Sequence, residues 1–162
     1  MIRIKHLSFL MIAICAITLS SCGGGSGGGG DDTPALTAEE QRLLDLVGTT
    51  GVTYVASSIT FNGAAATGFD DFSLTLRGTA SSKTYSTTDG DPVFKATGLW
   101  AFNGTNINQI LIDGNSSNTF AISSFNATAG TFTLTVNFVA SGGVAAGTAS
   151  TNGTYVFNLV KQ

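Results

Sequence analysis

The stretch Thr131-Phe132-Thr133-Leu134-Thr135-Val136-Asn137-Phe138-Val139 decides the fold, because polar and apolar residues alternate along its length. Successive side chains of a β-strand point to opposite faces of a sheet, so this alternation predicts a strand with one buried face and one polar face. The same period of two recurs over residues 72–77 and 155–159. Together these segments predict an all-β domain whose sheet has one apolar side.

Five further segments are predicted as strands because they have shorter runs of apolar and β-branched residues. They are Val52–Phe61, Ser82–Ser86, Leu99–Phe102, Ile107–Ile112 and Thr119–Ser123. The first changes parity around Ala56-Ser57-Ser58. Such a change predicts a β-bulge or bend at that point of the strand.

Turn dipeptides lie at or near the predicted strand ends. They are Asn62-Gly63, Asp89-Gly90, Asn103-Gly104, Asp113-Gly114 and Asn152-Gly153. Such dipeptides favour tight hairpins with positive φ, which join neighbouring antiparallel strands. Closing the strands into a barrel removes exposed sheet edges, and about 110 residues suffice for one such domain. We therefore predict an eight-stranded antiparallel up-and-down barrel, preceded by one short capped α-helix.

The helix is predicted from a capping box in Thr37-Ala38-Glu39-Glu40. The Thr37 hydroxyl can accept from the Glu40 amide, while the Glu40 carboxylate reaches back. Leu43, Leu44 and Val47 then recur on one helical face, and Gly48 stands where a left-handed residue ends a helix. We expect a helix of three turns that lies across an open end or flank of the domain as a structural plug.

The N-terminal segment has the features of a lipoprotein signal. Arg3, Lys5 and His6 precede an apolar run over residues 7–19, which is too short to span a membrane as a helix. Leu19-Ser20-Ser21-Cys22 then resembles the bacterial lipobox, which implies cleavage of residues 1–21 and lipidation of Cys22. An ordinary secretory signal with a coincidental cysteine, or an amphipathic N-terminal helix, are the alternatives.

Residues 22–36 are predicted to be a flexible tether between this anchor and a barrel domain over residues 37–162. Residues 23–30 contain only Gly and Ser, and such a segment buries too little apolar surface to repay its ordering entropy. A tether of about 14 residues has an average reach of roughly 20 Å. Glycines followed by Asp31-Asp32 resemble the tethers of lipoproteins from a large group of Gram-negative bacteria. The resemblance implies the outer membrane, and it leaves the periplasmic and cell-surface faces open.

Composition limits the chemistry. Without residues 1–21 the chain keeps five basic and all ten acidic residues, and it loses its only histidine. The resulting charge of −5 and the lack of a basic patch argue against nucleic acid as a partner. With Cys22 acylated and no imidazole, Cys–His, Ser–His–Asp and most zinc sites are excluded. We therefore expect no cofactor or metal ion.

Carboxylates remain as potential catalytic groups. A pair of them can hydrolyse a glycosidic bond, but nearly every acidic residue lies in a predicted helix or turn. A calcium loop at Asp89 and Asp91 is a further alternative, although it lacks the ligand repeat of an EF-hand. We therefore expect a protein that is not an enzyme.

The capped helix ending in Leu46-Val47-Gly48, the eight strands and Thr97-Gly98-Leu99-Trp100-Ala101-Phe102 resemble bacterial lipocalin-like lipoproteins. The resemblance covers roughly residues 36–162 and implies a barrel of this class. Many members carry a Gly-x-Trp motif before the first strand. Here those positions read Gly48-Thr49-Thr50, and Gly98-Leu99-Trp100 falls in a middle strand.

Two functions follow from a barrel of this size. An eight-stranded barrel either just fills with side chains or holds one small ligand. The first function is binding of a small apolar or amphipathic ligand in an interior lined by Phe72, Leu74, Trp100, Phe102, Phe132, Phe138 and Phe157. The second is a structural or interaction role, in which these side chains form a packed core and the Thr/Asn-rich outer face contacts glycan or a protein. In both cases we expect a monomer held to the membrane through Cys22.

Overall fold

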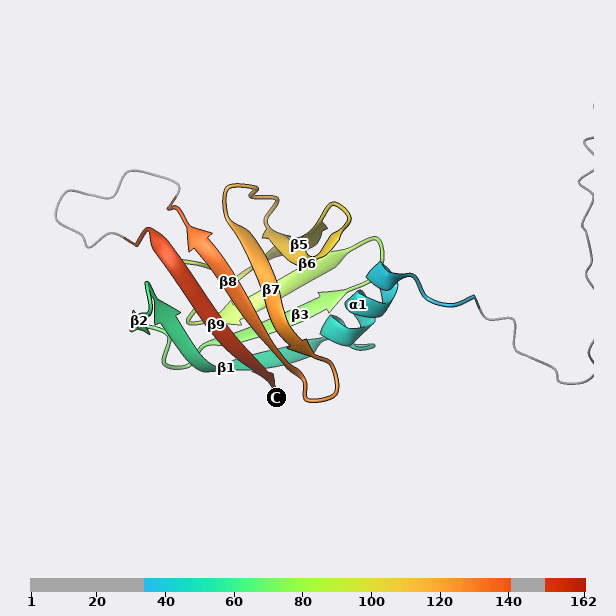
Figure 1. Cartoon of the computed structure of the whole chain (residues 1–162), viewed down its shortest axis with the longest axis horizontal. Coiled ribbons are helices and arrows are strands. Elements are labelled where there is room, and N and C mark those ends of the chain that lie inside the picture. Colours follow the sequence, from blue (N-terminus) through green and yellow to red (C-terminus); the bar gives the residue numbers. More distant parts are fainter. Residues whose placement is uncertain (1–33, 141–150) are drawn as a thin grey trace, which may run out of the picture. The chain divides into compact units, whose positions relative to one another are not determined.

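Eight antiparallel strands close into a barrel, because the last strand pairs with the first as well as with its predecessor (Figure 1). This computed structural model describes residues 34–140 and 151–162, so the predicted signal peptide, Cys22 and most of the tether lie outside the described residues. The barrel strands are β1 (Val52–Phe61), β3 (Ser73–Gly78), β4 (Lys83–Thr88), β5 (Thr97–Asn103), β6 (Asn106–Ile112), β7 (Thr119–Asn126), β8 (Thr131–Phe138) and β9 (Gly153–Lys161). A two-residue strand, β2 (Ala64–Ala65), pairs antiparallel with the last two residues of β1.

The strand order confirms the predicted up-and-down barrel, since each barrel strand pairs with its neighbours in sequence. The inward faces also follow the predicted alternation. In β8 the side chains of Phe132, Leu134, Val136 and Phe138 are buried, and the threonines between them are half-buried. The predicted bulge is present, because the ladder between β1 and β9 shifts register between Ala56 and Ser58.

Two expectations about the strand connections need correction. β8 ends at Phe138, one residue earlier than predicted, because Val139 pairs with the side chain of Asn118 instead of continuing the ladder. Three of the turn dipeptides do not form tight hairpins: Asp89-Gly90 begins the longer connection 89–96, Asp113-Gly114 begins the connection 113–118, and Asn152-Gly153 ends the connection before β9. Gly153 is already the first residue of β9, opposite Phe138, and the connection from β8 begins at residue 139.

The helix α1 (Ala38–Val47) has the predicted capping box. The Glu40 amide donates to Thr37 Oγ1 over 3.2 Å, and the Thr37 amide donates to Glu40 Oε2 over 2.8 Å. One detail of its buried face differs from the prediction: Leu46, not Leu44, is buried beside Leu43 and Val47, and Leu44 is 41% exposed. The barrel contacts a narrow stripe of the helix, and Leu44 lies about 100° around the axis from Leu43.

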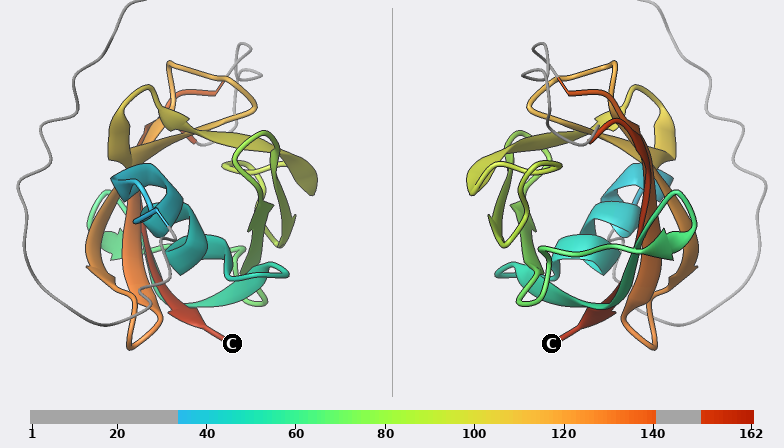
Figure 2. Two further views of the ribbon diagram at one scale, coloured as in Figure 1. Left: turned by 90° about the vertical axis from the view of Figure 1, so that its right-hand side faces the viewer. Right: turned by 90° about the vertical axis from the view of Figure 1, so that its left-hand side faces the viewer.

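α1 lies across one end of the barrel, as Figure 2 shows in its end-on views. Besides the packing of its buried side chains, polar contacts help to hold it there. Tyr54 Oη donates to the Leu46 carbonyl over 2.8 Å, Arg42 Nη2 donates to Asn108 Oδ1 over 2.9 Å, and Glu39 pairs with Lys83 over 3.7 Å. The described residues contain no helix long and apolar enough to cross a membrane.

We expect Tyr54→Phe to lower the free energy of unfolding by about 1–3 kcal/mol, because the buried Leu46 carbonyl at the helix end loses its donor. Urea unfolding followed by far-UV circular dichroism measures the change. Tyr155→Phe is the matched control, since this ring is also buried and keeps its contacts with Phe138 and Phe157. If Tyr54→Phe lowered the free energy of unfolding no more than Tyr155→Phe does, the stabilising role of this hydrogen bond would be contradicted.

Candidate functional site

The seven residues that were predicted from the sequence to line a ligand-binding interior are all buried inside the barrel. The rings of the six aromatic residues among them contact one another or neighbouring rings. Phe72 and Phe157 have centroids 5.1 Å apart, and the Trp100 and Phe102 rings meet edge-on at 5.4 Å. Trp100 also donates from Nε1 to the Arg77 carbonyl over 3.1 Å. These side chains therefore pack as a hydrophobic core around the barrel axis.

Phe94 enters this core from the connection between β4 and β5. Its ring is 4% exposed and lies 5.0 Å from Phe120 and 5.5 Å from Phe157, measured between centroids. The connection is held by the Phe94 amide, which donates to the Gly90 carbonyl, and by the Thr87 hydroxyl, which donates to the Lys95 carbonyl. Phe94 thus fills the end of the barrel opposite α1.

A pocket of about 370 Å³ lies at this same end. It is formed by the β4–β5 and β6–β7 connections together with the end of β8. Its apolar wall consists of Tyr85, Pro92, Val93, Phe94, Ile112, Phe120 and Phe138. Its polar groups belong to Asp91, Lys95, Asp113, Asn115 and Asn118. Of the seven predicted lining residues, the pocket includes Phe138 alone.

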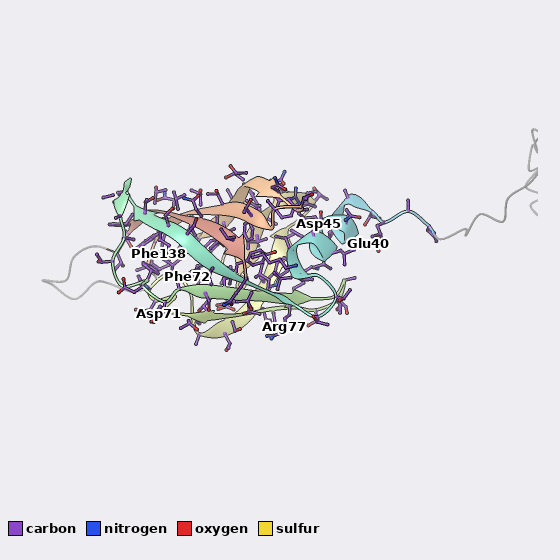
Figure 3. The ribbon with its side chains drawn as sticks, turned by 90° about the horizontal axis from the view of Figure 1, so that it is seen from below. Glu40, Asp45, Asp71, Phe72, Arg77 and Phe138 are labelled. Atoms are coloured by element: carbon purple, nitrogen blue, oxygen red, sulfur yellow. The ribbon has the colours of Figure 1, made fainter. Side chains whose placement is uncertain are left out.

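The two ends of the barrel therefore differ in what covers them. Figure 3 shows Asp71, Phe72 and Phe138 toward one end of the barrel, and Glu40 and Asp45 on α1 toward the other. α1 covers its own end with packed leucine and valine side chains. The opposite end carries the pocket of about 370 Å³, and a hollow of about 380 Å³ at the α1 end is lined by the α1–β1 connection, the start of β1 and the C-terminal residues 161 and 162.

Asp113 is the centre of the polar side of the pocket. Its Oδ1 accepts from the Leu99 amide over 2.9 Å, and its Oδ2 lies 3.0 Å from Lys95 Nζ and 3.4 Å from Tyr85 Oη. Burial acts to raise the pKa of Asp113, but the Leu99 amide, Lys95 and Tyr85 together lower it below the ordinary value. This carboxylate is therefore suited to hold a negative charge and not to donate a proton.

The same contacts act on Tyr85. Burial and the adjacent charge of Asp113 raise the pKa of Tyr85 to about 12, so its hydroxyl stays protonated near neutral pH. Gly98 allows this arrangement, because a Cβ there would collide with Asp113 Oδ1 and would lie 2.6 Å from the Tyr85 ring. The pocket wall thus depends on a glycine in β5.

Asn118 fixes the other side of the pocket. It is buried, its Nδ2 donates to the Val139 carbonyl over 3.0 Å, and its Oδ1 accepts from the Val139 amide over 2.8 Å. This pair of bonds imitates one rung of a β-ladder and joins the β6–β7 connection to the end of β8. The pocket walls are therefore tied together by hydrogen bonds.

The described residues contain no group of three or more His, Cys, Asp or Glu side chains placed to hold a metal ion. The predicted turn at Asp89 is present, with a φ of 48° at that residue. Asp89 Oδ2 accepts from the Asp71 amide over 3.2 Å, which connects two neighbouring loops. Asp89 thus has a structural contact within the loops of this end.

Sequence reasoning located most elements of this site but not the site itself. It placed Asp89, Asp91 and Asp113 in turns, whereas it gave no role to Tyr85, Phe94, Lys95 or Asn118. The one available signal was the apolar pair Val93-Phe94 inside a connection that is otherwise rich in Asp, Gly and Pro. Apolar residues in such a connection indicate a loop that folds back onto the core.

No protein-family model, curated protein sequence or solved structure matches this chain. Its class is therefore defined by architecture alone. The protein is a closed eight-stranded antiparallel barrel with one short helix, an arrangement consistent with a lipocalin-like fold.

We expect Asp113→Asn to lower the free energy of unfolding at pH 7 by about 1 kcal/mol, because the charge-assisted contacts with Lys95 and Tyr85 are lost. The folded-state pKa of Asp113 is lowered, so its stabilising charge is present above about pH 4 and is lost as the pH falls through that lowered value. The difference from the wild type should therefore shrink on acidification. Urea unfolding at pH 7 and pH 3 measures it.

Asp91→Asn is the control for this experiment, because Asp91 is exposed at the same pocket. It removes the same charge without removing the contacts of Asp113. The structural role assigned to Asp113 would be contradicted if both variants lost the same free energy of unfolding. It would also be contradicted if the difference between Asp113→Asn and the wild type did not change with pH.

Proposed function

We propose that this protein is a lipid-anchored lipoprotein of the cell envelope that binds a small amphipathic ligand at the barrel end opposite α1. The observation that carries the proposal is the pocket of about 370 Å³ formed by the β4–β5 and β6–β7 connections. Pockets that bind small molecules typically measure about 300–1,000 Å³ and combine an apolar lining with a few polar groups. This pocket meets both criteria.

The arrangement of its walls supports an amphipathic ligand. Pro92, Ile112 and Phe138 offer apolar surface to a hydrocarbon part, and Asp113 and Lys95 present charged groups to a polar head. The site differs from the one expected from the sequence, which placed the ligand along the barrel axis. Since the core side chains pack against one another there, the ligand binds at the end of the barrel.

The anchor is proposed from the sequence. Leu19-Ser20-Ser21-Cys22 supports lipidation of Cys22, and the Gly-rich tether supports a domain held away from the outer membrane, on its periplasmic or cell-surface face. We propose a monomer that acts without catalysis, cofactor or nucleic acid. Binding and anchoring together describe a carrier or receptor for a small molecule at the envelope.

A second candidate is a packed barrel that binds glycan or protein through its outer wall. One observation favours it: the only charged residues in the described strands are Arg77, Lys83 and Lys161, each at or next to a strand end. Side-chain hydrogen bonds link neighbouring strands of this wall: Thr133 on β8 donates to Asn158 on β9, and Asn158 donates to Ser58 on β1. A neutral, hydroxyl-rich surface of this kind suits an uncharged partner.

The ligand proposal is tested with residues 23–162, which include the whole compact unit from Ala35 onward. We expect native mass spectrometry to detect a co-purified small molecule, or else binding of added octanol. Amide chemical shifts should then move at Lys95, Asp113 and Asn118 in a two-dimensional NMR titration. No binding, or shifts confined to the outer faces of β8 and β9, would support the second candidate instead.

The anchor is tested in the full chain expressed in a Gram-negative host. We expect the wild type to appear in the membrane fraction with a mass increase from acylation, and Cys22→Ser to lose both properties. Ser21→Ala is the control, because a small residue before the cysteine is retained. Acylation that persists in Cys22→Ser would overturn the proposal for this residue.

A further inference from the structure

We infer that the pocket selects ligands whose polar head is a cation, such as a small alkylammonium amphiphile. This inference rests on the proposed function, because it concerns the charge of the ligand in the same pocket. It follows from the position of the charged side chains relative to the apolar wall.

The net charge differs between the two ends of the barrel: among the described residues, the α1 end carries Arg42, Arg77, Lys83 and Lys161 together with the carboxylates of Glu39, Glu40 and Asp45. Connections at the pocket end carry five carboxylates, those of Asp70, Asp71, Asp89, Asp91 and Asp113. Among the described residues of these connections, Lys95 is the one cation, and the sequence of residues 141–150 contains no charged residue. All three charged strand residues are basic and lie at the α1 end. The pocket therefore opens into a region of negative potential.

Two of these carboxylates lie on the pocket itself. Asp91 and Asp113 both line it, together with Lys95. A second hollow of about 300 Å³ adjoins it and shares Asp91, Phe94 and Lys95, and it adds Asp89. A ligand head in this region thus meets three carboxylates and one ammonium group.

The ammonium group is already paired. Lys95 Nζ lies 3.0 Å from Asp113 Oδ2, so an anionic ligand would compete with Asp113 for it and would also face Asp91. A cationic head needs no such exchange, because Asp91 and Asp89 are both exposed near the same opening. The charge of a ligand head bound in the pocket and the charges of these carboxylates attract or repel each other measurably at low salt, and added salt screens this interaction. Clefts lined by one sign of charge raise the local concentration of the opposite sign.

The apolar wall supplies the other half of the recognition. Ile112, Phe120 and Phe138 lie on the same pocket as Asp91 and Asp113, so one molecule can contact both surfaces. Its hydrocarbon part contributes affinity by burial, independent of charge. The carboxylates then determine which head group is favoured.

The experiment compares three probes with one hydrocarbon chain: octylammonium, octanol and octanoate. They are titrated into residues 23–162 by NMR at low ionic strength and pH 7. We expect octylammonium to bind roughly tenfold more tightly than octanoate, with octanol between them, and the ratio to fall toward one in high salt. Shifts should occur at Lys95, Asp113 and Asn118 for every probe that binds.

Three variants test the origin of the preference. Asp91→Asn should lower the ratio of octylammonium to octanoate affinity by roughly threefold. Lys95→Gln should raise the ratio, because it frees the Asp113 carboxylate. Asp45→Asn removes the same charge on α1 at the opposite end, and it should change nothing.

The outcomes separate the inference from the proposed function. If no probe binds the pocket, the proposed function fails. If octanol binds but octanoate binds as tightly as octylammonium, the pocket is real and the inference on charge is overturned. A preference for octylammonium that Asp91→Asn leaves intact also overturns it.

Discussion

The pairing of β1 with β9 is the constraint on which the rest of the structure depends. It turns a row of hairpins into a closed wall, in which each of the eight described barrel strands has a partner on both sides. Closure also fixes where everything else can lie. With each strand reversing direction, successive connections alternate between two ends, and the helix and the pocket are thereby assigned to opposite ends of the barrel.

The two ends are closed by different means. α1 covers one end with a capped helix, held by the Tyr54 hydroxyl on the Leu46 carbonyl. Phe94 fills the other from a loop, and the walls around it are joined by the two hydrogen bonds between Asn118 and Val139. The proposed ligand site lies at the Phe94 end, in the pocket formed by the β4–β5 and β6–β7 connections.

The strands could be predicted from the sequence, because a strand with one buried face alternates apolar and polar residues, and this alternation is visible within a few residues. The cap at Thr37 could also be predicted, since capping involves neighbours along the chain. The pocket was not predictable in this way. Tyr85, Lys95 and Asp113 meet only after the registers of β4, β5 and β6 are set, and Phe94 lies in a connection without periodicity. Burial of Leu46 in place of Leu44 likewise depends on how the barrel meets the helix.

Closure by the first and last strands has a consequence for the order of folding. Ser57 bonds to a residue 101 positions further along the chain, so β1 has no partner on that side until β9 has been made. Contacts between such distant segments form slowly, because a long loop must be ordered first. The barrel therefore cannot close before β9 has been made, so closure is confined to the last part of synthesis or to the time after it.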